Sequence, residues 1–173
     1  MTRRRWMLWG AAVALLAGCG AEVHDGPYEG APPKGESLGE MRQQAGEALA
    51  RYDQAVLAAA DLTTVDVTPP PWKSPPGISI EAATGVRTGT RLTVTFTGAA
   101  GPATEPCGVD YRAEAVESAN AVVVIVIAQP YATDEACLLS GHPRTATLEL
   151  ARPLGARVVL EARQGLPVLL TTG

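Results

Sequence analysis

The chain has 173 residues, a formal net charge of −4 and 46% hydrophobic side chains. This length is enough for one ordinary domain with a hydrophobic core. The acidic balance excludes the electrostatic footprint of a nucleic-acid-binding protein, and it provides no basic patch for an anionic lipid surface.

The N-terminus has the pattern of a secretory signal peptide. Arg3, Arg4 and Arg5 precede a mostly apolar run that ends in small residues. A charged start, a short apolar core and a small-residue cleavage site define such a signal. The run is shorter than the roughly 20 apolar residues of a spanning helix. We therefore predict that residues 1–18 are a signal peptide.

The motif Leu16-Ala17-Gly18-Cys19 follows the apolar core directly. It resembles the lipobox of bacterial lipoprotein precursors. The resemblance implies cleavage before Cys19, thioether attachment of a lipid to its thiol, and acylation, as by palmitate, of the new amino group. It also implies anchoring at the outer face of the cytoplasmic membrane. The start of the chain also resembles a twin-arginine export signal, and the choice between this route and general secretion stays open.

Removal of the signal leaves 11 basic against 18 acidic side chains, a net charge of −7. Residues 19–35 are rich in Gly, Pro and charged side chains without periodicity, which predicts a flexible tether. Residues 36–173 are expected to form a single globular domain.

Residues 37–60 have helical periodicity. Ser37 and Glu40 are spaced as a capping box. Apolar side chains recur at three- and four-residue steps from Leu38 to Ala59, which predicts an amphipathic helix that packs on the body. Partner binding or coiled-coil pairing through this face is the alternative. Residues 61–77 contain two proline clusters around Trp72 and are expected to be a stiff, extended linker whose Trp72 docks on the domain. The alternative is a proline-rich ligand for another domain.

Residues 78–173 are expected to form strands. Alternation predicts strands near 78–81, 92–97 and 109–116. Three more strands are expected at 145–150, 157–162 and 168–171, with Gly155 and Gly165 to Pro167 between them. The β-branched run Val122–Ile127 does not alternate, so it is predicted to be a central strand with a layer on each face. A short connection through Ser118 and Asn120 favours a hairpin. The expected fold is α+β, with the helix on a mainly antiparallel sheet of six or seven strands. A β-sandwich with an N-terminal helix is the alternative.

Cys107 and Cys137 are the two cysteines left after Cys19. An even pair in an exported chain predicts a disulfide. The sequence contains no C-x-x-C motif and no histidine spaced as a co-ligand, so we expect no metal site and no cofactor.

The signals for catalysis are weak. Ser140 and His142 are too close in sequence to indicate a nucleophile and its base, and no G-x-S-x-G motif is present. Asp110 and Glu114 are expected on the solvated face of a strand. We assign no catalytic residue. The stretch Gln129–Arg144 is the longest loop expected among the strands, and it is a candidate recognition loop. Its candidate side chains are Tyr131, Asp134, Glu135, His142 and Arg144.

Several stretches resemble uncharacterised envelope lipoproteins of actinobacterial type. They are Pro106 to Tyr111, Ala115 to Ser118, Arg144 to Ala146 and Pro153 to Gly155. The resemblance implies a protein class and no mechanism. The expected function is a non-enzymatic binding or interaction module, anchored to the membrane by its lipid. Its expected partner is an envelope protein or a small ligand. The alternative is a small envelope hydrolase that uses His142 with a nearby carboxylate.

Overall fold

The computed structural model describes residues 38–59, 65–69, 77–131, 137 and 141–173. The predicted signal peptide, the predicted lipid-attachment residue Cys19 and the predicted tether lie outside the described residues. Most of the predicted linker, including Trp72, also lies outside them. In the described part of the chain, no helix combines the length and the apolar character needed to cross a membrane.

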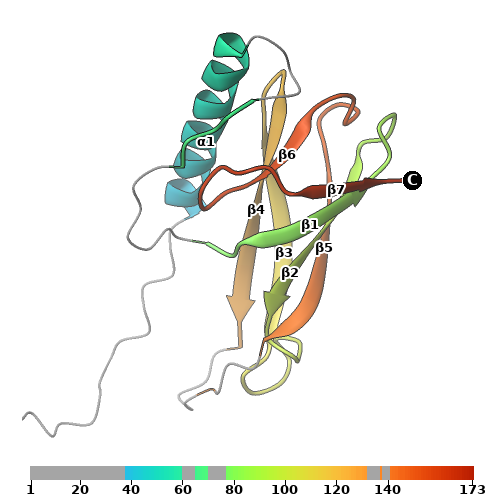
Figure 1. Cartoon of the computed structure of the whole chain (residues 1–173). Helices are drawn as coiled ribbons and strands as arrows, with labels where there is room; N and C mark the ends of the chain where they lie inside the picture. Colours follow the sequence, from blue (N-terminus) through green and yellow to red (C-terminus); the bar gives the residue numbers. More distant parts are fainter. Residues whose placement is uncertain (1–37, 60–64, 70–76, 132–136, 138–140) are drawn as a thin grey trace, which may run out of the picture. The chain divides into compact units, whose positions relative to one another are not determined.

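The predicted helix is present as α1, Leu38–Ala58. Its buried stripe follows the periodicity of the sequence, because residues three and four apart share one face of a helix. The stripe consists of Met41, Gln44, Ala45, Ala48, Leu49 and Tyr52. This face packs against strand β4, and the two run side by side in Figure 1.

Four strands form the first sheet, in the order β5-β2-β1-β7. Their bounds are β1 Ile80–Gly85, β2 Arg91–Gly98, β5 His142–Glu149 and β7 Leu169–Thr172. The β1–β2 and β2–β5 pairs are antiparallel, whereas β7 pairs parallel with β1. This sheet is therefore mixed.

Three strands form the second sheet, in the order β3-β4-β6. They are β3 Val109–Glu117, β4 Ala121–Pro130 and β6 Val158–Glu161. The first two form the predicted antiparallel hairpin, which turns through residues 118–120. Strand β6 joins β4 in parallel, so this sheet is mixed as well.

Strand β4 separates two hydrophobic cores. Val122, Val124 and Val126 face the first sheet, and Val123 and Ile125 face α1. The sequence prediction of a layer on each face of this strand is therefore confirmed.

The α+β class and the number of strands are confirmed, but the strands do not form one mainly antiparallel sheet. There are two mixed sheets, of four and three strands. They face each other, as in the sandwich alternative, and the helix adds a third layer. The reason is physical: a fully apolar strand needs cover on both faces, and one helix covers only one of them.

Candidate functional site

The predicted recognition loop is shorter than expected, because both its ends belong to strands. Gln129 lies in β4, while His142 and Arg144 lie in β5. Strand β5 is at the edge of its sheet, the position in which a strand accommodates a proline such as Pro143. Asp134 and Glu135 lie outside the described residues. Tyr131 is exposed, and its backbone N–H donates to the Gly108 carbonyl.

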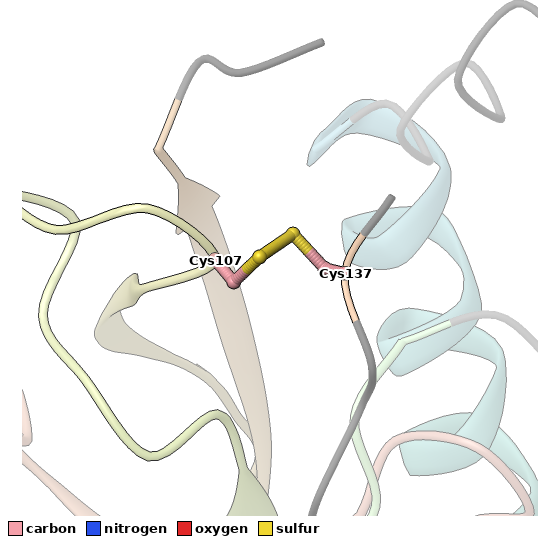
Figure 2. Close-up of a disulfide and its surroundings, with 2 residues drawn as sticks. All are labelled: Cys107 and Cys137. Atoms are coloured by element: carbon pink, nitrogen blue, oxygen red, sulfur yellow. A yellow bond between two sulfur atoms is a disulfide. The ribbon is translucent and has the colours of Figure 1, made fainter. Parts of the chain in front are cut away.

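Cys107 and Cys137 are joined in a disulfide, as the sequence predicted (Figure 2). The bridge ties the loop before β3 to the segment after β4. Cys107 has a left-handed backbone, with φ of 63°. Gly108 beside it tolerates no side chain, because a Cβ there would lie 1.7 Å from the Pro102 carbonyl oxygen. The Cys-Gly pair thus fits a tightly folded loop.

Arg144 has a structural role at this end of the molecule. Its guanidinium lies over the Tyr111 ring, 5.7 Å from the centroid, and donates to the Ala100 carbonyl. The Tyr111 hydroxyl accepts a hydrogen bond from the Ala99 N–H. These contacts hold the loop after β2 in place, so the charge of Arg144 already has a partner.

The carboxylates considered as partners for His142 are engaged elsewhere. Glu114 forms ion pairs with Arg42 at 2.6 Å and Arg112 at 2.8 Å. Asp110 accepts a hydrogen bond from the Ala103 N–H. Among the residues that the structure describes, no group of three His, Cys, Asp or Glu side chains is arranged to hold a metal ion.

A cleft of about 310 Å³ lies at the other end of the β3–β4 hairpin. One wall is α1, through Tyr52 and Val56. The second is the hairpin turn at Ala119 and Asn120. The third is the loop from Arg152 to Val158, which leads into β6. The volume is at the lower end of the range for small-molecule pockets.

The third wall is held by two arginines. Arg157 has a side chain that is only 5% exposed, and it is paired with Glu117 at 2.5 Å. Its other N–H groups donate to the carbonyls of Arg152, Pro153 and Leu154. Arg87 donates to the carbonyls of Gly155 and Arg157. Since these bonds fix the backbone, the loop forms a rigid wall.

Glu117 anchors this arrangement electrostatically. Burial opposes ionisation of its carboxylate, but hydrogen bonds from Arg157 and from the Ala151 N–H outweigh it, with help from the charges of Arg157 and Arg152. The net result is a pKa below the ordinary value. The Glu117–Arg157 pair is therefore ionised and internally neutral at physiological pH.

The first two walls are joined by a polar network. The Asp53 carboxylate accepts hydrogen bonds from the Ser118 hydroxyl at 3.0 Å and the Asn120 amide at 2.9 Å. Beside it, Tyr52 is only 5% exposed. Its hydroxyl makes no hydrogen bond with any residue that the structure describes. Burial, and then the charge of Asp53, raise the pKa of Tyr52, so the hydroxyl stays protonated and is able to donate.

A smaller cleft of about 230 Å³ lies over the loop after β6, at Ser79, Glu161 and Leu166. The buried Glu161 carboxylate there accepts hydrogen bonds from the backbone N–H groups of Arg163 and Gln164. This carboxylate stabilises its own turn, so the larger cleft is the stronger candidate for a binding site.

Sequence reasoning did not identify the larger cleft. Tyr52 belongs to the apolar stripe of the helix. Since that stripe is recognised by apolar character alone, it does not indicate that the Tyr52 hydroxyl lines a cleft. Asn120 and Arg152 are turn residues whose proximity depends on tertiary structure. The available signal was the spacing of Arg152 and Arg157 around Pro153 and Gly155, a turn with two cations.

Comparison of the chain with family models, with curated proteins and with solved structures gives no match.

Proposed function

We propose that this chain is an exported lipoprotein, anchored through Cys19 to the outer face of the cytoplasmic membrane. Residues 19–35 act as the tether, and the folded part is a non-enzymatic binding module of the cell envelope. The lipobox motif supports the anchor. The Cys107–Cys137 disulfide supports an oxidising compartment, where such bonds persist.

In this proposal, the ligand is a small molecule and its site is the cleft between α1, the hairpin turn and the Arg152–Val158 loop. The observation that carries the proposal is the Tyr52 hydroxyl. It lines a cleft with rigid walls, and it has no hydrogen-bond partner in the described structure. Although the Tyr52 side chain is largely buried, its hydroxyl oxygen is not one of the buried side-chain atoms that lack a partner, so it reaches the cleft and is able to donate to a ligand there.

The anchor is tested by Cys19→Ala. We expect the variant to leave the membrane fraction, because no acyl chain then holds it. Cell fractionation followed by immunoblotting measures this. If Cys19→Ala stays in the membrane pellet as firmly as the parent, the anchor lies elsewhere.

The cleft is tested with the lipid-bearing full chain in detergent. The chain is incubated with a small-molecule extract of the producing cells and washed, and the retained compounds are identified by mass spectrometry. Ala156→Trp places a bulky ring in the cleft, whereas Ala128→Trp adds the same ring at an exposed position on β4. We expect the parent and Ala128→Trp to retain a compound that Ala156→Trp loses. Equal retention by all three would exclude the cleft.

A further inference from the structure

We infer that the cleft binds a small molecule with a carboxylate group, and that Arg152 is its counter-charge. This inference rests on the proposed function, because it assumes that the cleft is the binding site. It is supported by three features of the cleft lining: its used acceptors, its available donors and its cation without a direct counterion.

The acceptors of the third wall are already used. From Arg152 to Arg157, every backbone carbonyl except that of Ala156 accepts a hydrogen bond from an arginine side chain. The carbonyl of Asn120, in the second wall, accepts from the Val158 N–H. A ligand rich in donors therefore finds few free acceptors on these walls.

Donors remain available. The Arg152 side chain lies exposed at the rim, where one terminal nitrogen donates to the Ser118 carbonyl. A guanidinium has five N–H donors in all. The Tyr52 hydroxyl adds a donor deeper in the cleft. Free donors facing used acceptors favour a ligand that is rich in acceptors.

The charges favour the same ligand. Glu117 is neutralised by Arg157, and Asp53 is hydrogen-bonded to Ser118 and Asn120. Arg152 acts on Glu117 through space but forms no ion pair with any described carboxylate. It is thus the cation that lines the cleft without a direct counterion. Guanidinium binds carboxylate with two parallel hydrogen bonds, the geometry that makes arginine selective for this group.

The remaining lining is apolar and suits a hydrocarbon body. It comes from Val56, Ala119, Pro153 and Val158. A ligand with an apolar body and one carboxylate would bury the body against these side chains and place the carboxylate at the rim, near Arg152.

The test uses the full chain in detergent with benzoate and benzamide as probes. The two have nearly the same shape, and only benzoate is charged. Isothermal titration calorimetry measures the dissociation constants. We expect benzoate to bind about tenfold or more tightly than benzamide, as befits a charge-assisted pair. Arg152→Gln should remove this preference. Arg112→Gln, at a half-exposed arginine of β3 that pairs with Ile127, away from the hairpin turn, should preserve it. Circular dichroism checks that each variant is folded.

Each other outcome overturns the inference. Equal binding of the two probes, abolished by Ala156→Trp, would show that the cleft binds ligands without selecting an anion, and the proposed function would stand. A preference for benzoate that survives Arg152→Gln would place the anion site elsewhere. Binding of neither probe would overturn the inference, and retention of extract compounds would then decide the proposed function separately.

Discussion

The two ends of the β3–β4 hairpin are held by different chemistry. At one end, a disulfide ties Cys107 to Cys137, and Arg144 and Tyr111 hold the adjacent loop. At the other, the loop from Arg152 to Arg157 is held without covalent bonds, by Arg87, Arg157 and Glu117. The hairpin strands of nine and ten residues separate these ends by about 30 Å.

The comparison shows which end has groups left for a ligand. At the disulfide end, two of the polar side chains are occupied: Arg144 by Tyr111 and Ala100, and Asp110 by the Ala103 N–H. At the cleft end, occupation of the acceptors leaves Arg152 and Tyr52 as donors. The length of the loop between β4 and β5 points to the disulfide end as the ligand-binding site. The free donors of Arg152 and Tyr52 point instead to the cleft end.

The largest expected effect on stability is that of replacing Arg157, which holds the loop from Arg152 to Val158. Arg157→Met removes the partner of Glu117 and the side-chain donor of three loop carbonyls, of which that of Leu154 keeps the Arg157 backbone N–H. Breaking a buried ion pair in this way costs about 3–5 kcal/mol, so the free energy of unfolding should fall by that amount. Urea denaturation followed by circular dichroism measures it.

The matched control is Arg91→Met. Arg91 and its partner Glu149 have side chains that are 78% and 59% exposed. Exposed ion pairs contribute little to stability, so this variant should stay close to the parent. If Arg157→Met were as stable as Arg91→Met, the loop would not depend on its arginine.

The second largest expected effect on stability is that of removing the Cys107–Cys137 disulfide. The bridge closes a loop with a sequence separation of 30. Replacing both cysteines by serine should lower the free energy of unfolding by about 3–4 kcal/mol, mainly because the unfolded chain gains entropy. The same urea titration measures this change. Since the cleft is at the other end, probe affinity in the folded variant should be unchanged, and a large loss of affinity would show that the ends are coupled.

A smaller effect is expected on how stability depends on pH, through the Glu117 carboxylate. The pKa of Glu117 is lower in the folded protein than its ordinary value of 4.5. Its stabilising contribution is therefore complete above about pH 4.5 and is lost as the pH falls through the folded pKa. Acid titration of the free energy of unfolding should be less steep for Glu117→Gln than for the parent. Identical slopes would mean that this carboxylate has no part in acid unfolding.

The smallest expected effect on stability is that of Tyr52→Phe. The hydroxyl has no partner in the described structure, so its removal should change the free energy of unfolding by no more than about 0.5 kcal/mol. Benzoate affinity should nevertheless fall, because a donor is lost from the cleft. A stability loss above about 1.5 kcal/mol would indicate that the hydroxyl is bonded within the protein.

The sequence was sufficient for elements whose signals are local. The helical stripe, the alternating strands and the hairpin around Ser118 all follow from periodicity and turn residues. The double burial of Val122–Ile127 follows from the lack of alternation.

Non-local pairing was not predictable in this way. Strands β6 and β7 each have four residues and pair in parallel with strands far back in the chain. The residues of β6 and β7 do not indicate which strands they pair with. The cleft depends on the same long-range arrangement, because Tyr52, Asn120 and Arg152 meet only after the helix, hairpin and loop are packed.

The most direct test of the central claim is to map where a probe binds. Amide chemical shifts of the ¹⁵N-labelled full chain in detergent are recorded during a benzoate titration. The account predicts progressive shifts at Tyr52, Asn120 and Ala156, and none at Tyr131 or His142. Shifts centred on Tyr131 and His142 would contradict it and would return the binding site to the disulfide end.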